Sequence, residues 1–394
     1  MRIGILCAPT YGGSGVVATE LGRFLARRGH TVHFISTAMP FRLDIGPHEN
    51  IFFHEVQAVN YPVLPGEMFE ISFAGKAVQV MQDYGLDVVH AHYAIPHAIS
   101  AFLAGQVMQG DGLKVVTTLH GTDITLVGRS PSIYPIVRYA IEHSDAVTAV
   151  SEWLRQETVD AFGITGRIDV IPNFVDENKF RRGLGRCPKE YFAPGGEKVL
   201  LHVSNFRPVK RVQDVIRVFA KVREEVPSRL LLVGDGPERD GAARLARELG
   251  VMQCVYFLGK QEAIENYFAC ADLLLFPSEY ESFGLAALEA MASENVVIAS
   301  RAGGLPEVIT HGVDGFLAPV GAVEEMARIA VDILRDDERR LAVGKAARQA
   351  AIEKFHPEQV VPMYERLYER VVAGEACGRS REGKAGQTGI SPRS

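Results

Sequence analysis

Residues 273–291 decide the fold, and they read LLLFPSEYESFGLAALEAM. The four apolar residues at 273–276 have the length of a buried strand, and the segment after the glycine has the composition of a helix. Ser282 has the side chain of a helix N-cap, which leaves three backbone amides as free donors: Phe283, Gly284 and Leu285. A strand, a turn and a helix with free amides are typical of an α/β domain that binds an anion where its strand ends.

Apolar runs of strand length recur on both sides of this stretch. They lie at 2–7, 31–36, 87–91, 114–119, 146–150 and 168–171, and they resume at 199–203, 230–233, 255–258 and 296–300. The spacing leaves room for a helix after most of them, as at 212–222, where apolar residues recur at helical intervals. This alternation predicts parallel sheets that are covered by helices on both faces.

The length of 394 residues favours two domains. A polar, glycine-rich stretch at 183–198 separates the two sets of strands, so we predict an α/β chain with two Rossmann-like domains that face each other across a cleft. We assign 1–175 to the first domain and 176–357 to the second, and we expect a helix at about 358–372 to cross back to the first. The tail, 373–394, lacks apolar periodicity and is predicted to be disordered.

Composition narrows the class of function. The net charge of −6 argues against a nucleic-acid groove and favours a small-molecule partner. The apolar runs are too short to span a membrane, and the N-terminus lacks the pattern of a signal peptide, so we expect a cytoplasmic protein. The five cysteines are scattered without a CxxC pair, which indicates reduced thiols and no zinc site.

Two glutamates flank the predicted anion site. Glu281 lies in the turn before the helix, and Glu289 lies about two turns into it. Carboxylates accept hydrogen bonds from paired sugar hydroxyls, so one is suited to a transferred hexose and the other to a ribose. The alternative is a helix cap and a surface glutamate.

Two cations, Arg207 and Lys210, follow the first strand of the second domain. There they would face the cleft, where a leaving diphosphate gains negative charge as a glycosidic bond breaks. We expect these side chains to stabilise that charge without a metal. The alternative is a solvated basic turn, although cations at a helix N-terminus are disfavoured unless an anion joins them.

Polar strand ends in the first domain add further candidates. The segment 12–15 lies in the usual place for a phosphate loop, although a tight structural turn explains its glycines equally well. His120 follows a strand, where a neutral imidazole can bond a donor sugar and Asp123 or the turn can orient it. His90 and His92 alternate on a strand without a third ligand, so we expect hydrogen-bonded structure or sugar contacts there and no metal.

In this order, the motifs resemble the family 4 retaining glycosyltransferases of the GT-B fold. The resemblance rests on Glu281 and Glu289, on Arg207 and Lys210, and on the glycine turns at 234–237 and 303–307, and it extends from residue 1 to about 372. It implies a nucleotide-sugar donor in the second domain and an acceptor in the first. The implied catalytic residues are Glu281, His120, Arg207 and Lys210, and no cofactor is expected.

The resemblance also implies the contacts of the donor. Its diphosphate would lie against Arg207, Lys210 and the amides of Phe283, Gly284 and Leu285. Glu289 would bind the ribose and Glu281 the sugar hydroxyls. Uracil would lie near 234–237 and 258–260. Gly15, Gly234 and Gly259 complete the implied donor contacts.

Four segments, 12–15, 40–43, 90–98 and 117–125, narrow the resemblance. They are similar to the branch of the family that transfers N-acetylglucosamine from UDP-GlcNAc to L-malate in the first step of bacillithiol biosynthesis. The implied acceptor contacts are Ser14, Tyr93, Thr118 and Arg138, with Thr117 as a further candidate. A guanidinium and several hydroxyls suit a small dicarboxylate.

Other functions stay open at this point. Another acceptor, such as a lipid or polysaccharide, would fit a membrane-facing basic patch of Arg23, Arg27 and Arg28. A UDP-sugar-binding protein without turnover and a non-hydrolysing UDP-GlcNAc epimerase are further alternatives, and the sequence is compatible with a homo-oligomer. For transfer we expect attack from the face that UDP leaves, because the acceptor motifs contain no evident base, and closure of the domains over the donor.

Overall fold

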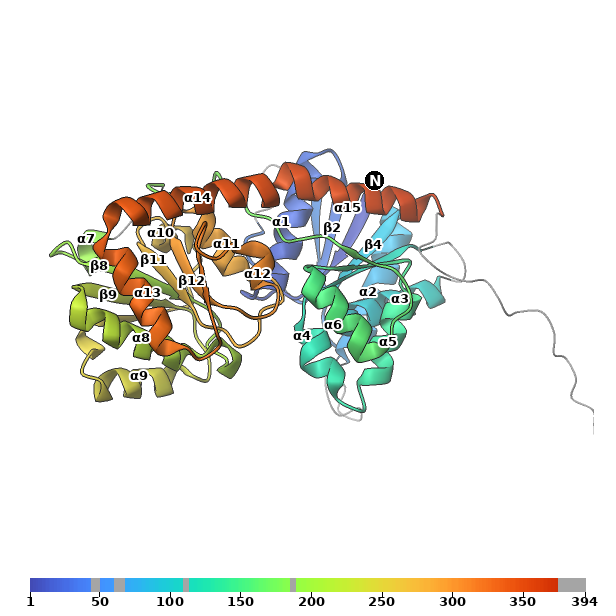
Figure 1. Ribbon diagram of the computed structural model, residues 1–394. Coiled ribbons are helices and arrows are strands. Elements are labelled where there is room, and N and C mark those ends of the chain that lie inside the picture. Colours follow the sequence, from blue (N-terminus) through green and yellow to red (C-terminus); the bar gives the residue numbers. More distant parts are fainter. Residues whose placement is uncertain (44–49, 60–67, 109–112, 185–188, 375–394) are drawn as a thin grey trace, which may run out of the picture.

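The computed structural model describes residues 1–43, 50–59, 68–108, 113–184 and 189–374. Figure 1 shows two α/β domains side by side, with the last two helices, α14 (Asp337–Phe355) and α15 (Pro357–Val372), running along the top of both. The predicted two-domain architecture is confirmed. The predicted disorder of the tail concerns residues that lie, apart from 373 and 374, outside the described part.

The first domain contains a seven-stranded parallel sheet with the order β3-β2-β1-β4-β5-β6-β7. The strand order reverses between β1 and β4, which is where a doubly wound sheet opens a crevice at its carboxyl edge. The strands are β1 (Arg2–Leu6), β2 (Thr31–Ser36), β3 (Ile51–Glu55), β4 (Val88–His92), β5 (Val115–Leu119), β6 (Ala146–Ala149) and β7 (Ile168–Val170). The helices that cover them include α1 (Gly13–Arg27), α2 (Phe69–Tyr84), α3 (Ile99–Val107), α4 (Thr122–Thr125), α5 (Tyr134–His143) and α6 (Glu152–Phe162).

The second domain repeats this plan with a six-stranded parallel sheet in the order β10-β9-β8-β11-β12-β13. Its strands are β8 (Lys198–Val203), β9 (Ser228–Val233), β10 (Val255–Gly259), β11 (Leu273–Phe276), β12 (Val296–Ser300) and β13 (Phe316–Ala318). Its helices are α7 (Lys189–Phe192), α8 (Val212–Glu225), α9 (Arg239–Glu248), α10 (Glu265–Phe268), α11 (Leu285–Ala292), α12 (Leu305–Val308) and α13 (Val323–Arg335). The switch between β8 and β11 brings the loops after these two strands together.

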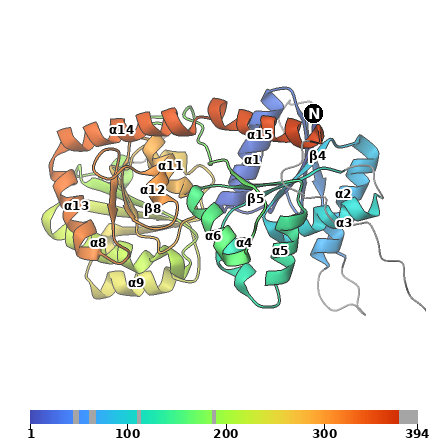
Figure 2. The same cartoon turned by 45° about the vertical axis from the view of Figure 1, so that its right-hand side comes forward.

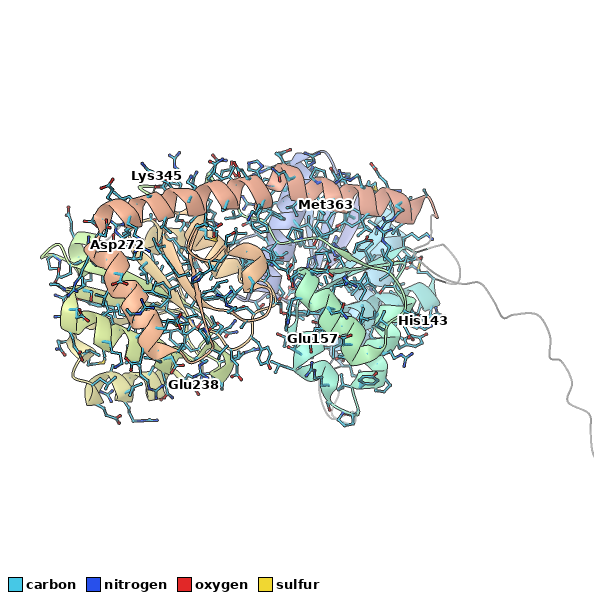
Figure 3. All side chains as sticks on the ribbon, in the orientation of Figure 1. His143, Glu157, Glu238, Asp272, Lys345 and Met363 are labelled. Carbon is cyan, nitrogen blue, oxygen red and sulfur yellow. The ribbon has the colours of Figure 1, made fainter. Side chains whose placement is uncertain are left out.

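The C-terminal helices join the two domains. Asp272 is fully buried and forms ion pairs with Lys189 and Arg340, with nitrogen–oxygen distances of 2.9 and 3.2 Å. Because Arg340 lies in the first turn of α14, this carboxylate anchors the start of that helix to the second domain (Figure 3). The next helix, α15, packs Tyr364 and Tyr368 into the core of the first domain. Figure 2 shows this helix lying over that domain. Burial of a large side chain stabilises the fold by about 1.5–3 kcal/mol, so these rings fix the helix on the first domain.

No helix in the described ranges combines the length and the apolar content needed to cross a bilayer. Cys7, Cys254 and Cys270 are buried. Burial raises the pKa of the Cys7 thiol to about 12, so this group stays protonated at neutral pH.

Candidate active site

The loop between β11 and α11 carries the residues predicted to bind the donor. The helix begins at Leu285, after Gly284, whose φ of +95° is a left-handed conformation that glycine tolerates. The prediction of Ser282 as the N-cap is therefore wrong, because the chain turns later and Ser282 lies against Gly121 of the first domain. Glu289 consequently lies little more than one turn into the helix, and not about two.

The amides predicted to bind the diphosphate are free. Within the part of the chain that the structure describes, the N–H groups of Phe283, Gly284 and Leu285 donate no hydrogen bond. A Cβ at Gly284 would lie 2.6 Å from the Leu305 side chain, so this position needs glycine for space as well as for conformation. Unpaired amides at the start of a helix attract an anion, so the loop is suited to a phosphate group.

Lys210 and Glu281 form the centre of the second-domain wall. The Lys210 Nζ lies 2.5 Å from Glu281 Oε1, and the Ser278 hydroxyl donates a hydrogen bond of 2.9 Å to the same oxygen. Both charged side chains are mostly buried, with 18% and 11% of their surface exposed. The two contacts hold one carboxylate oxygen and orient the other away from them, which leaves Glu281 able to accept a sugar hydroxyl.

Arg207 lies on the same turn as Lys210 but is exposed. Burial raises the pKa of Tyr93 in the first domain, and the positive charge of Arg207 opposes that rise, so Arg207 faces the opposite wall of the cleft. Among the described carboxylates it has no ion-pair partner, so its guanidinium is available for an anion.

Glu289 is held from the other domain by Arg42. The Arg42 guanidinium nitrogen lies 3.0 Å from Glu289 Oε1, and the two side chains are only 5% and 4% exposed. Burial raises the pKa of Glu289, while Arg42 and Lys179 lower it. The segment 40–43 contributed to the resemblance, but Arg42 itself was given no role, and its position shows that it fixes the carboxylate predicted to bind the ribose.

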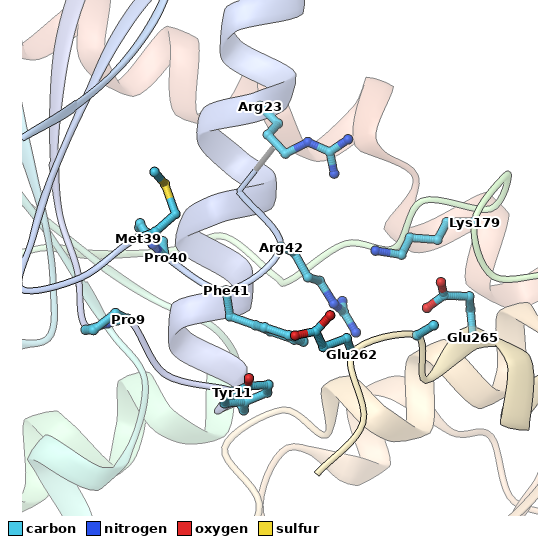
Figure 4. A pocket seen from close by; sticks show the side chains of 11 residues that line it. Pro9, Tyr11, Arg23, Met39, Pro40, Phe41, Arg42, Lys179, Glu262 and Glu265 are labelled. Carbon is cyan, nitrogen blue, oxygen red and sulfur yellow. The ribbon is translucent and has the colours of Figure 1, made fainter. Parts of the chain in front are cut away.

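A cavity of about 620 Å³, open to solvent, adjoins this ion pair. Figure 4 shows Arg42 projecting into the space between Lys179, Glu262 and Glu265. The described residues that line this cavity do not include Arg207, Lys210 or Glu281, and the cavity adjoins the predicted donor site at Arg42, which pairs with Glu289. We therefore define the candidate site by the free amides and the charged side chains of the loops, and not by this cavity.

We expect Arg42→Met to lower the free energy of unfolding by about 3 kcal/mol near neutral pH, because it leaves the buried Glu289 carboxylate unpaired. The folded-state pKa of Glu289, already raised by burial, then rises further above its unfolded value. The folded chain takes up the proton more readily than the unfolded chain, so the loss is small at low pH and grows as the pH rises. Urea unfolding at about pH 5 and about pH 8 measures the difference.

The control for this prediction is Arg328→Met, which breaks a surface pair with Asp332 whose side chains are 67% and 53% exposed. It is expected to cost about 0–1 kcal/mol at either pH. A pH-independent loss in Arg42→Met would contradict the assignment of Glu289 as the group left unpaired.

Tyr93 and Ser14 lie together on the first-domain wall. Tyr93 follows β4 with a φ of +88°, a strained conformation for a bulky side chain that is common where a residue must be aimed. Its hydroxyl lies beside those of Ser14 and Thr122, which lower its pKa, while burial raises the pKa more strongly. Tyr93 therefore keeps its proton and can donate a hydrogen bond.

The ring of His120 contacts another histidine, and the Asp123 carboxylate bonds the backbone of the same turn, including that of His120. His92 Nδ1 lies 2.9 Å from His120 Nε2, and burial lowers the pKa of His120 to about 3, so the ring is neutral. Asp123 accepts the backbone N–H groups of Gly121 and Ala94 at 3.0 and 2.9 Å. The carboxylate shapes the loop around His120, and His92 sets the orientation of the imidazole.

Three predicted acceptor residues use their side chains for other contacts, although the Tyr93 amide donates to the Thr118 carbonyl oxygen at 2.9 Å. Thr117 and Thr118 are fully buried in β5. The Thr117 hydroxyl bonds the Ser144 hydroxyl at 2.7 Å. The Thr118 hydroxyl bonds His90 Nε2 at 2.6 Å and the Thr148 hydroxyl at 2.7 Å. Arg138 is exposed on α5 and pairs with Glu142 at 2.9 Å. The structure does not bring these side chains to the tyrosine, and their contact with an acceptor stays a prediction.

The predicted donor glycines lie at loop ends. A Cβ at Gly15 would lie 2.6 Å from the Thr10 carbonyl oxygen, so close packing alone explains this glycine. Gly234 and Gly259 pair with each other at the ends of β9 and β10, and both have positive φ. Their donor contacts also stay predictions. Within the described ranges, no three His, Cys, Asp or Glu side chains form a group that could hold a metal ion.

Two family models match the chain, one on each domain. The family described as Glycosyltransferase Family 4 matches residues 11–179, and the family described as Glycosyl transferases group 1 matches residues 187–350. The chain is 46% identical over 380 residues to N-acetyl-alpha-D-glucosaminyl L-malate synthase of Bacillus anthracis, with 96% of this chain and 99% of the relative covered.

Solved structures share the fold. Sucrose-phosphate synthase of Thermosynechococcus elongatus superposes with a TM-score of 0.79 at 22% identity, covering 95% of this chain and 99% of that one. Anabaena Alr3699/HepE in complex with UDP and glucose superposes with a TM-score of 0.75 at 23% identity, covering 94% and 99%. These likenesses support the GT-B architecture, and the 46% identity over nearly the whole length shows that the chain belongs to the family of glycosyltransferases that includes N-acetyl-alpha-D-glucosaminyl L-malate synthase.

Proposed function

We propose that this chain transfers N-acetylglucosamine from UDP-GlcNAc to the hydroxyl of L-malate, as in the first step of bacillithiol biosynthesis. The observation that carries the proposal is the 46% identity to the Bacillus anthracis enzyme that is named for this product, over 96% of the chain. The free amides beside Lys210 and Arg207 support a nucleotide-sugar donor, since such groups favour a diphosphate.

The donor would lie on the second-domain wall. Its diphosphate would contact Arg207, Lys210 and the amides of residues 283–285. Its sugar hydroxyls would contact Glu281, which pairs with Lys210. Its ribose would contact the oxygen of Glu289 that Arg42 does not bind. The acceptor would lie across the cleft against Ser14 and Tyr93, where hydroxyl donors suit a carboxylate.

In the proposed reaction the malate hydroxyl oxygen forms a bond to C1 of the sugar as the bond from C1 to the β-phosphate oxygen breaks. The electron pair of the broken bond leaves with UDP, and the hydroxyl proton passes to a β-phosphate oxygen on the same face. Tyr93 keeps its proton, and His120, with a pKa of about 3, is a weak base, so neither competes well for that proton. The configuration at C1 is then retained.

A lipid acceptor receives less support. Arg23 pairs with Glu20 at 3.0 Å, Arg28 pairs with Glu358 and Glu365 at 2.7 and 3.0 Å, and Arg27 lies against the Phe24 ring. Most of the positive charge predicted for a membrane-facing patch is therefore neutralised within the protein, which weakens attraction to anionic lipid.

We expect purified protein to release UDP from UDP-GlcNAc rapidly with L-malate and only slowly without it. A coupled assay of UDP release, with mass spectrometry of the product, measures both the rate and the acceptor. Binding of UDP-GlcNAc without release would favour the binding protein, and release with another hydroxyl compound but not with malate would favour a different acceptor.

A further inference from the structure

The two domains touch where the donor loop meets the start of α6. Glu307, in the α12 segment of the second domain, accepts the backbone N–H groups of Glu152 and Trp153, each at 2.8 Å and each by a different carboxylate oxygen. These are the first two residues of α6 in the first domain, whose amides have no partner inside their own helix. One carboxylate of the second domain thus binds the positive end of a helix in the first.

Ser151 strengthens the same contact. Its hydroxyl caps α6 by accepting the Leu154 amide at 3.1 Å and donates to the Ser282 carbonyl oxygen at 2.6 Å. Ser151 is 1% exposed, so this second bond across the domains is shielded from water. Ser282 directly precedes the amides proposed to bind the diphosphate, and therefore α6 holds the donor loop itself.

The segment that carries Glu307 also holds the donor loop from its own side. The Gly304 amide donates to the Glu281 carbonyl oxygen at 2.8 Å. A Cβ at Gly303 would lie 1.9 Å from that oxygen, and a Cβ at Gly304 would lie 2.4 Å from the Ser282 carbonyl oxygen, so the backbones are in direct contact. A shift of Glu307 relative to α6 would therefore be passed to the loop of Glu281.

We propose that Glu307 is a positioning residue that fixes the donor loop against the first domain and so aligns the sugar with the acceptor wall. Both oxygens of the Glu307 carboxylate are already occupied by the amides of α6, so Glu307 is not one of the donor contacts proposed above. Its loss should impair transfer more than it impairs nucleotide binding, because alignment of reacting atoms affects the rate most strongly. This kinetic consequence rests on the proposed function, whereas the contact itself does not.

Trp153 provides a direct reporter of the contact. It is the only tryptophan of the chain, its amide is bound by Glu307, and its half-buried ring centroid lies 6.4 Å from that of Tyr280 in the second domain. Separation of α6 from the second domain would expose the indole to solvent. Acrylamide quenching of the intrinsic fluorescence therefore follows this one interface.

The test compares Glu307→Ala and Glu307→Gln with wild type. We expect Glu307→Ala to increase acrylamide quenching of Trp153 and to lower kcat with L-malate about 10- to 100-fold, while the dissociation constant of UDP stays close to that of wild type. Glu307→Gln keeps one acceptor oxygen, so its quenching and its kcat should lie between those of wild type and those of Glu307→Ala. The matched control is Glu338→Ala, which removes an exposed acid from the first turn of α14, away from the domain contact, and should change neither quantity.

Unchanged quenching and unchanged kcat in Glu307→Ala would overturn the proposal, as would an equal loss of kcat and of UDP affinity, which would assign Glu307 to donor binding. If malate does not stimulate UDP release in wild type, the proposed function fails, but quenching of Glu307→Ala still decides whether Glu307 holds the domains together.

Discussion

Glu281→Ala is expected to lower kcat for transfer to L-malate about 10³-fold while UDP binds with wild-type or higher affinity. The wild-type carboxylate is held by Lys210 and Ser278, so it offers a fixed acceptor to the sugar hydroxyls, and loss of one aligned polar contact has a large effect on the rate. The same change removes a negative charge beside the proposed diphosphate and frees Lys210 to bind it. Steady-state kinetics and calorimetric titration with UDP measure the two quantities.

The control for Glu281 lies two residues upstream. Glu279 is exposed and has the same side chain on the same loop, so Glu279→Ala should retain wild-type kinetics and report any general disturbance of the loop. A loss of UDP affinity in Glu281→Ala that matches the loss of kcat would contradict the assignment, because it would make Glu281 a contact of the nucleotide and not of the sugar.

The central strands could be predicted from the sequence because buried parallel strands are continuous apolar runs. The predicted ranges 31–36, 273–276 and 296–300 coincide with β2, β11 and β12. The strands that were missed, β3 and β13, lie at sheet edges. β3 is half-buried with a charged end, so it lacks the continuous apolar run of a central strand.

The donor loop could be predicted because its chemistry is local in sequence. Lys210 and Glu281 each follow a strand at the same edge of one sheet, so strand order alone brings them together. The pair of Arg42 and Glu289 joins residues 247 positions apart in different domains, and no local pattern indicates it. The same holds for Glu307 and the start of α6, which depend on how the domains dock.

The first-domain wall was harder to predict because strand-end hydroxyls look alike in sequence. Thr117 and Thr118 point to opposite faces of β5, and helices cover both faces, so both hydroxyls are used inside the sheet. Tyr93 lies one residue beyond β4, outside the covered region, and is free to face Ser14. A polar side chain inside a strand is therefore used within the sheet, whereas one that lies a single residue beyond the strand end can face the cleft.

Replacing both Arg207 and Lys210 with methionine is expected to lower kcat about 10⁴-fold. Each cation is suited to stabilise the charge on the departing diphosphate, and removal of one such group typically costs about 10²- to 10³-fold. Lys210→Met alone should have the larger effect of the two single changes, because Lys210 is 18% exposed and Arg207 is in contact with solvent that screens its charge.

The affinity for UDP gives these cation variants a signature that separates them from Glu281→Ala. Lys210→Met removes the positive charge and leaves the Glu281 carboxylate unpaired beside the diphosphate, so it should weaken UDP binding, whereas Glu281→Ala should preserve or strengthen it. The double variant of Lys210→Met and Glu281→Ala lacks the repulsion between the Glu281 carboxylate and the diphosphate, so its affinity for UDP should recover part of the loss. Arg217→Met, which removes an exposed cation paired with Asp214 on α8, should leave both kcat and affinity unchanged. If Lys210→Met and wild type bind UDP with equal affinity, the diphosphate lies elsewhere, because loss of a cation that binds the diphosphate would raise the dissociation constant of UDP.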